Sequence, residues 1–311
     1  MSTIRIADIG LMEAAKRLIP ITVAAGSAAM VIQDVLMAGR VQNTFSKEEE
    51  DGYNKQALTD ADILCSNMIG AAALAQFSDL SYLSEEAKAD NVSKYFLHGQ
   101  PYVLVFDPIN GTSYFKDGKR CYENIYTIAD AGYADASHTL VKNTQRAVVI
   151  NMPRQQMVYV GDGITTLRAD TTRLCFDGRG DIDLLPHHVP QTARGGVYVS
   201  VSLKDQLEAI RSCGLDACVA HHAYQAYGYK DPDWDFVPSG ILDGRVSAFA
   251  IAGIDLMDSL AVAYLAQGAG IHVLIEGYDP ATHIARLAIA AIDKREFDIL
   301  CDILAPIRST V

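Results

Sequence analysis

The sequence is short of basic residues, and this shortage excludes several classes of partner. Among 311 residues, 26 Lys and Arg stand against 38 Asp and Glu, which gives a formal net charge of -12. Nucleic-acid-binding proteins hold phosphate backbones with a surplus of Lys and Arg, so we expect no nucleic-acid polymer as a partner. The same deficit argues against docking on an anionic membrane surface.

Long apolar runs and paired cysteines are also missing. The chain has no uncharged apolar run of about 18 residues, and no basic segment leads into an apolar one near Met1. We therefore expect a cytoplasmic protein that does not enter a membrane. The six cysteines are scattered, and none forms a C-x-x-C pair. This usage predicts free thiols in a reducing compartment.

Hydrophobic patterns along the chain predict helices interspersed with strands. Helices are expected at 21–37, 59–75, 204–213, 258–268 and 297–304, and strands at 102–106, 125–129, 147–151, 156–160 and 197–201. Pro20 is expected near the start of the first helix, where its missing N–H costs nothing. The segment 177–196 has no clear period and is rich in Gly, Asp, Pro and His. It is the expected junction between two domains, 1–190 and 191–311.

The most informative stretch begins with Asp107, which follows the apolar run 102–106. A strand there delivers a carboxylate at its end, and Asn110 brings a second polar side chain. Gly111 lets backbone approach a ligand closely, and Thr112 adds a hydroxyl. Backbone N–H groups at such a turn form an anion site, and a carboxylate beside an anion calls for a cation between them. The alternative is an ordinary Asp-Pro turn on the surface, which the apolar strand before it makes less favourable.

These residues resemble the D-P-[IL]-D-G-T signature of the inositol monophosphatase-like family of Mg²⁺-dependent phosphatases. Segment 82–86 resembles the family's G-E-E segment, 58–60 its T-D segment, and 258–270 its W-D-x-A-A-G…E-A-G-G motif. The four segments occur in the family's order over nearly the whole chain. The resemblance implies a mixed α+β fold, a layered αβαβα sandwich of the sugar-phosphatase type. It also implies a homodimer that hydrolyses a small phosphate monoester.

The resemblance further implies a set of metal ligands. Glu85 would bind a first ion and help orient the attacking water, Asp107 would bridge two ions, and the Ile109 carbonyl would bind the first. Asp258 would bind the second ion, together with Asn110 at the position where the family has Asp. The implied ions are two or three Mg²⁺, with Mn²⁺ as an alternative and Ca²⁺ or Li⁺ as inhibitors. Hard oxygen donors suit this choice.

Two further roles follow from the same resemblance. Thr112, backed by Asp60, would polarise the nucleophilic water. The backbone N–H groups of Gly111 and Thr112 would hold phosphate oxygens.

Asn110 is the main departure from the family. An amide keeps one oxygen donor but loses a full charge, so affinity for the second ion should fall. An engineered change that traps substrate, natural tuning and lost activity all remain open, and the intact set around Asn110 favours engineering over decay.

Several other patterns carry less weight. Segment 233–237 fits the D-x-D-x-[TV] pattern of haloacid dehalogenase-type phosphatases, but the apolar strand that this chemistry needs does not precede it. The adjacent His221 and His222 would point in different directions on a helix, so a shared ligand role is not expected.

The substrate is the least determined property. Segment 248–253 has no carboxylate where many inositol-type enzymes contact substrate hydroxyls, so we expect inositol monophosphate not to be the best substrate. A sugar or polyol phosphate is the first expectation, and a 3′(2′),5′-bisphosphate nucleotide is the alternative. A catalytically weak protein that binds phosphorylated sugars is the alternative from another class.

Overall fold

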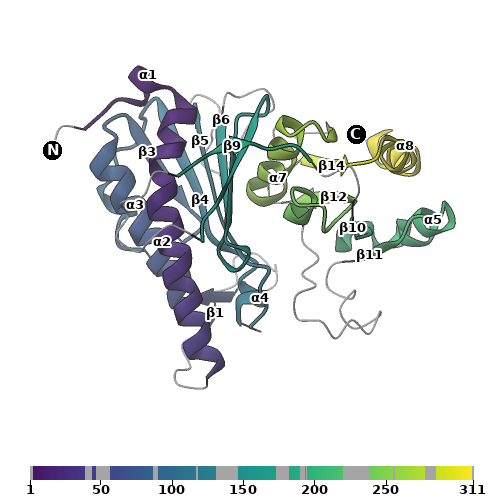
Figure 1. Ribbon diagram of the computed structural model, residues 1–311, viewed down its shortest axis with the longest axis horizontal. Helices are drawn as coiled ribbons and strands as arrows, with labels where there is room; N and C mark the ends of the chain where they lie inside the picture. The colour runs from purple at the N-terminus through teal and green to yellow at the C-terminus, as the bar shows by residue number, and fades with distance from the viewer. Residues whose placement is uncertain are drawn as a thin grey trace. The chain divides into compact units, whose positions relative to one another are not determined.

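The computed structural model describes residues 3–38, 44–46, 57–86, 90–116, 118–130, 146–172, 182–189, 193, 195–219, 238–254, 256–276 and 285–309. The chain forms two compact units (Figure 1). The first comprises Met1–Gly132, Gln145–Val160 and Arg168–Leu184, and the second comprises Tyr133–Thr144, Gly161–Leu167 and Leu185–Val311. The sequence predicts a domain boundary after residue 190, and the long segment of the second unit begins at Leu185.

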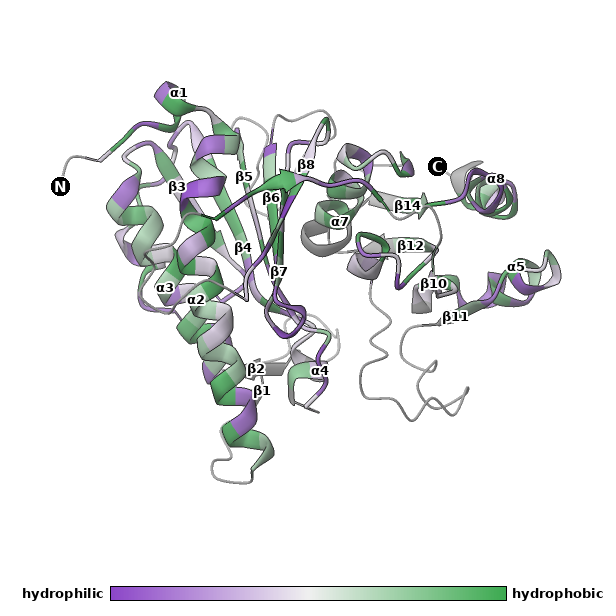
Figure 2. Cartoon of the chain, in the orientation of Figure 1, coloured by the Kyte–Doolittle hydropathy of each residue, from purple (hydrophilic) through white to green (hydrophobic). Residues whose placement is uncertain are grey.

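A seven-stranded sheet has the order β3-β4-β5-β6-β7-β8-β9. Its strands are β3 (Leu80–Ser84), β4 (Tyr102–Asn110), β5 (Glu123–Asp130), β6 (Arg146–Met152), β7 (Met157–Gly161), β8 (Thr166–Asp170) and β9 (Leu185–Pro186). β3 and β4 are parallel, whereas β5 is antiparallel to both β4 and β6. Nearly every residue of β4, β5 and β6 is buried, and these strands are largely hydrophobic (Figure 2). The strands predicted at 125–129, 147–151 and 156–160 are confirmed with slightly shifted ends.

Helices α2 (Leu11–Met37) and α3 (Asp60–Gln76) pack against each other and against this sheet (Figure 1). The short α1 (Ile6–Ile9) precedes them. The predicted start near residue 21 is wrong, because α2 begins at Leu11 and contains Pro20 in its interior. An interior proline costs about 3 kcal/mol. The turns before it bury Ala14, Ala15, Leu18 and Ile19 completely, and this burial offsets that cost.

By length and composition alone, α2 is apolar enough to cross a membrane. In this fold it is a core helix, because one face of it packs against α3, β5 and β6. Core helices of soluble proteins and signal sequences near an N-terminus can have the same length and composition.

α3 has Thr59 as its N-cap. Thr59 has an extended backbone, and its side chain and that of Asp62 form a reciprocal capping box. Before it, β1 (Thr44–Ser46) and β2 (Ala57–Thr59) form a two-stranded antiparallel ribbon. Most of the charged segment 46–56 lies outside the described residues.

The second unit has a five-stranded sheet of order β11-β10-β12-β14-β13. Its strands are β10 (Val197–Val199), β11 (Ala217–Val219), β12 (Ala248–Ile254), β13 (His272–Glu276) and β14 (Ala285–Ala291). β10 is parallel to β11 and β12, whereas β14 is antiparallel to β12 and β13. Both sheets are therefore mixed, which confirms the mixed α+β class.

The helices of the second unit are α5 (Leu207–Ser212), α7 (Leu256–Gly268), α8 (Lys294–Ile303) and α9 (Ala305–Ser309). The helix expected at 204–213 begins as a 3-10 segment, Val201–Gln206, and becomes α-helical at Leu207. The final helix begins at Lys294 rather than 297, because Asp293 caps it by accepting from two backbone N–H groups.

Five cysteines of the described part of the chain form no disulfide: Cys65, Cys121, Cys213, Cys218 and Cys301. The sixth, Cys175, lies outside the described part of the chain. The reducing compartment stays a prediction.

Candidate active site

Two of the predicted carboxylates emerge at the same edge of the first sheet. β3 and β4 run parallel with Ser84 opposite Phe106, so the residues that follow these two positions are neighbours. The Glu85 N–H donates to the Phe106 carbonyl at 3.0 Å, which fixes Glu85 beside Asp107. Asp107 is buried and Glu85 is half-buried. The sequence pattern thus places both acids where parallel strands deliver them together.

The signature itself forms a bulge in β4, and not the turn that the sequence suggested. The register passes from Asp107 opposite Ile125 to Asn110 opposite Glu123, so β4 has one residue more than β5 in this interval. Pro108 lies in the bulge, where its missing N–H breaks no ladder hydrogen bond. The strand therefore continues to Asn110 and carries the whole acidic segment.

Buried amides hold the bulge from behind. Asn124 Nδ2 donates to the Pro108 carbonyl at 2.5 Å, and Asn124 Oδ1 accepts from Asn151 Nδ2 at 2.8 Å. Both side chains are fully buried. Gly26 of α2 lies against this pair, and a Cβ there would collide with both amides. The helix thus approaches β5 and β6 closely enough to enclose the support of the signature.

Thr112 lies between a backbone carbonyl and an acid. Its hydroxyl donates to the Ile109 carbonyl at 2.8 Å and lies 3.4 Å from Asp62 Oδ1. Gly111 makes the reversal before Thr112 by adopting φ +86°, a conformation that other residues rarely adopt. α4 (Thr112–Lys116) then begins.

Among the described contacts, the acid that accepts a hydrogen bond from the Thr112 hydroxyl is Asp62. The family resemblance gives the supporting role to Asp60, and that assignment stays a prediction. The capping box orients Asp62 toward Thr112. Asp62 Oδ2 accepts from the N–H and the hydroxyl of Thr59, at 2.7 and 2.6 Å, and this leaves Oδ1 directed at Thr112. The signal was present in the sequence as Thr59 followed three residues later by an acid.

The surroundings of Asp62 disfavour its charged form. The pKa of Asp62 is raised to about 7, chiefly because burial disfavours the charged form, and the nearby carboxylates of Glu86 and Glu85 contribute to the rise, against hydrogen bonds from Thr59 that lower it. An acid with a pKa near neutrality can both accept and release a proton under physiological conditions.

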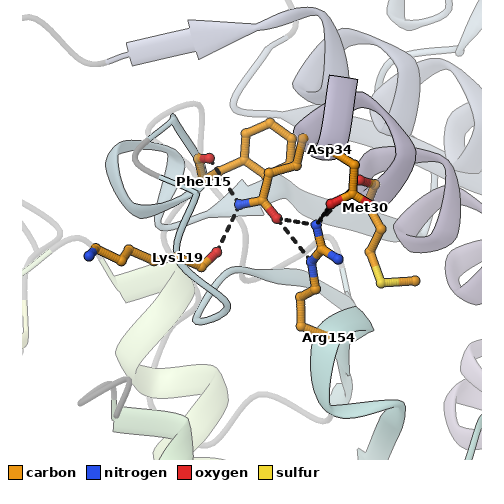
Figure 3. Close-up of polar contacts among 6 residues, drawn as sticks. Met30, Asp34, Phe115, Lys119 and Arg154 are labelled. Carbon is orange, nitrogen blue, oxygen red and sulfur yellow. Dashed lines mark hydrogen bonds and ion pairs between the residues drawn. The ribbon is translucent and has the colours of Figure 1, made fainter. Parts of the chain in front are cut away.

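A buried glutamine fastens the segment that follows the signature (Figure 3). Gln33 Nε2 donates to the carbonyls of Phe115 and Lys119 at 2.9 and 2.8 Å. Gln33 Oε1 accepts from Arg154 Nε and Nη2 at 2.9 and 2.6 Å. Arg154 Nη2 also reaches Asp34 at 2.5 Å. These contacts tie α2, α4 and the turn after β6 together, so the position of Thr112 depends on the core.

The predicted ligands have the chemical type of donor atom that a hard divalent cation prefers. Within the residues that the structure describes, no three acidic, histidine or cysteine side chains gather closely enough to hold an ion alone. The predicted ligands Glu85 and Asp107 would be joined by the Asn110 amide and by the second lone pair of the Ile109 carbonyl. All of these donors are oxygens, as Mg²⁺ prefers.

Asp258, the remaining predicted ligand, lies in α7 of the second unit, and its side chain is outside the described residues. The positions of His221, His222 and the 233–237 segment are outside them as well. These assignments therefore stay predictions.

The chain is similar to known proteins in its fold, whereas its sequence matches none of the families or curated proteins compared. No protein-family model and no curated protein sequence matches the chain. Among solved structures, the chain is similar to SuhB of Mycobacterium tuberculosis, with a TM-score of 0.56 and 14% identity, over 99% of both chains. It is also similar to an inositol monophosphatase from Zymomonas mobilis, with a TM-score of 0.54 and 14% identity, over 95% of this chain and 97% of that one.

A third similar structure is a putative sedoheptulose-1,7 bisphosphatase from Toxoplasma gondii. Its TM-score is 0.55 at 14% identity, over 91% of this chain and 92% of that one. The chain therefore has the fold of inositol monophosphatase-type phosphatases, over nearly its whole length.

Proposed function

We propose that this chain is a divalent-cation-dependent phosphatase that hydrolyses a small phosphate monoester of a sugar or polyol. The observation that carries the proposal is the Thr112 hydroxyl, held between Asp62 Oδ1 and the Ile109 carbonyl, beside the paired ends of β3 and β4. The fold shared with inositol monophosphatases and a bisphosphatase supports it. The functions of those proteins are extended to this chain as part of the proposal.

Each residue of the arrangement has a chemical role in the proposal. Glu85, Asp107 and the Ile109 carbonyl would hold a first divalent cation, and Asp107 and Asn110 would bind a second. When bound, the cations neutralise charge on the phosphate and on the attacking and leaving oxygens.

Thr112 and Asp62 act on the proton. Thr112 Oγ1 takes a proton from the attacking water as it passes its own hydroxyl proton to Asp62 Oδ1, so the threonine hydroxyl is restored. The raised pKa of Asp62 suits a group that takes up this proton near neutral pH. Asn124 and Gln33 touch no reacting atom and serve only to position the signature and α4.

Phosphate release from a panel of compounds tests the proposal. The panel contains sugar phosphates, inositol phosphates and an adenosine bisphosphate, each with and without Mg²⁺ or Mn²⁺. We expect Mg²⁺-dependent release, best from a sugar or polyol phosphate other than inositol monophosphate. Best release from the adenosine bisphosphate would favour the nucleotidase alternative. Binding of a sugar phosphate without release would favour the binding protein instead.

Glu85→Gln provides the matching variant. We expect it to abolish metal-dependent release while the protein stays folded, because it removes a cation-binding charge from a half-buried position. Glu13→Gln is the control, since Glu13 is an exposed acid that pairs with Arg17 and loses the same unit of charge. Full activity of the Glu85→Gln variant would contradict the assignment.

A further inference from the structure

Ser84 holds the backbone beside Glu85. Ser84 is the last residue of β3 and is 1% exposed, and its Oγ accepts a hydrogen bond from the Glu86 N–H at 3.1 Å. The Glu85 N–H donates to the Phe106 carbonyl. Two consecutive N–H groups are therefore fixed, one by the neighbouring strand and one by the Ser84 hydroxyl. The direction in which the Glu85 side chain leaves the backbone is fixed with them.

The Ser84 hydroxyl belongs to a buried chain of hydrogen bonds. Its Oγ lies 3.0 Å from Ser66 Oγ of α3, and Ser66 Oγ donates to Asp90 Oδ2 at 3.0 Å. The Tyr82 hydroxyl lies 2.8 Å from Ser66 Oγ and donates to the Ser66 carbonyl at 3.1 Å. Ser66, Ser84 and Tyr82 are each at most 6% exposed. Each hydroxyl of the chain thus has its partners inside the protein.

Counting protons gives the chain a direction. Each hydroxyl carries one proton, and an ionised carboxylate only accepts. The Ser66 proton goes to Asp90, and the Tyr82 proton goes to Ser66. The contact between Ser84 and Ser66 is therefore made by the Ser84 proton. The lone pairs of Ser84 Oγ then face the Glu86 N–H, and hydrogen bonds that follow one another in this way strengthen each other.

The far end of the chain is held by further contacts. Asp90 also accepts from Ser93 Oγ at 2.6 Å, and from the N–H groups of Val92 and Ser93 at 3.1 and 2.9 Å. The next residue, Asn91, donates its N–H to Asn67 Oδ1 of α3 at 2.8 Å. Residues 90 and 91 are therefore fastened to two consecutive residues of α3.

The same helix holds another part of the candidate site. Asp62, which contacts the Thr112 hydroxyl, lies four residues before Ser66 and therefore on the same face of α3. Ser66 in turn orients the hydroxyl that precedes Glu85. The separation of Glu85 from Thr112 is thus set through α3 as well as through the sheet.

We propose that the Ser84 hydroxyl is a positioning group for a divalent cation, because it fixes the Glu86 N–H and so directs the Glu85 carboxylate at the ion. Ser66 and Asp90 orient this hydroxyl. The inference rests on the proposed function for the existence of the cation, but not for any hydrolysis. Loss of a group that holds a metal ligand in its orientation typically weakens metal binding about 10–100-fold.

Calorimetric titration of the full chain with Mg²⁺ and, separately, Mn²⁺ tests the inference. Ser84→Ala removes the acceptor of the Glu86 N–H, so we expect cation binding to weaken about 10–100-fold. Ser81→Ala is the matched control. Ser81 belongs to the same strand, and its Oγ donates to the Leu97 carbonyl at 3.0 Å and accepts from the Gln100 N–H at 3.2 Å. It lies on the other face of β3, so the cation affinity of this variant should equal that of the wild type.

Ser66→Ala reaches the same hydroxyl from α3 and keeps the inference testable if Ser84→Ala does not fold. It leaves Ser84 unchanged but removes the acceptor of its proton, so we expect cation binding to weaken about 10-fold. A role in stability alone would lower the melting temperature of the chelated variants and leave their cation affinity unchanged. With a substrate from the panel, Ser84→Ala should need about 10–100-fold more Mg²⁺ for half-maximal release, and saturating Mg²⁺ should restore the rate.

Several results would overturn the inference. These are unchanged cation binding by Ser84→Ala, or by Ser66→Ala where the first variant does not fold, equal weakening by Ser81→Ala, and a wild type that binds neither ion at millimolar concentration. The proposed function fails differently. If cation binding depends on Ser84 while no compound of the panel releases phosphate, the hydrolase proposal is wrong and the inference stands. If release depends on Mg²⁺ but Ser84→Ala binds Mg²⁺ as the wild type does, the inference is wrong and the hydrolase proposal stands.

Discussion

Replacing Gln33 by Met should destabilise the protein far more than any surface change on α2. Met matches Gln in length but makes none of its four hydrogen bonds to Phe115, Lys119 and Arg154. Two backbone carbonyls then lose a donor, and each buried group left without one costs about 1–3 kcal/mol. The Arg154 side chain, which is 20% exposed, can turn its guanidinium partly to water and to Asp34. We therefore expect a loss of about 2–5 kcal/mol in the free energy of unfolding.

Urea denaturation of the wild type and the variant measures this loss, provided the slope of the transition stays the same. Asp34→Ala is the control, because Asp34 contacts the same arginine from a position 65% exposed. Its ion pair should contribute about 0–1 kcal/mol. Gln33→Glu separates the two halves of the contact. It keeps an acceptor for Arg154 but directs a carboxylate at two carbonyls, so it should also be destabilising.

One result would contradict this expectation. If Gln33→Met and Asp34→Ala lower stability equally, the buried amide does not hold the segment after the signature. Amide hydrogen exchange tests the same point independently. If Gln33 holds this segment, the backbone amides of α4 should exchange faster in the Gln33→Met variant than in the wild type.

Two further predictions concern the same unit. For Asp62, the folded pKa of about 7 exceeds the ordinary value of 3.8, so the stability of the chelated protein should be greatest below pH 4 as far as this group is concerned. The contribution is lost as the pH rises to about 7, by roughly 4 kcal/mol at most. Thermal unfolding at several pH values should show a flatter dependence for Asp62→Asn, and identical profiles would refute this. For Gly26, Ala normally stabilises a helix by about 1 kcal/mol. Here the new Cβ would collide with Asn124 and Asn151. We expect Gly26→Ala to lose about 1–3 kcal/mol in chemical denaturation, with Ser27→Ala near neutral.

Local signals explain the parts of the fold that the sequence predicted well. The start of α3 follows from a capping residue, and β5 and β6 follow from continuous apolar runs, all of which are properties of a few neighbouring residues. The sequence-based prediction was wrong where contacts between distant residues determine the local structure. Pro20 suggests a helix start, but the burial of the residues before it keeps α2 helical from Leu11.

The residues of the candidate site also differ in how far local sequence indicates them. The sequence indicated the signature through a strand, an acid and a glycine in one short segment, and it indicated Glu85 only through the family resemblance. Asn124, Asn151 and Gln33 carry no such pattern. Their importance comes from backbone carbonyls and amides that are distant in sequence, such as Gln33 with Phe115. Buried amides of this kind are apparent only once the strands and helices are packed together.

The pairing of Asn110 with Glu123 shows how little separates a predictable contact from an unpredictable one. Continuing the register of Asp107 opposite Ile125 without a bulge would set Tyr122 opposite Asn110. The one extra residue in β4 sets Glu123 there in place of Tyr122, and so places a carboxylate against the amide. Bulges depend on the fit of two strands and on what supports them, here the Asn124 amide on the Pro108 carbonyl. The sequence alone therefore makes Asn110 look like a lost charge, whereas the structure shows an acid directly behind it.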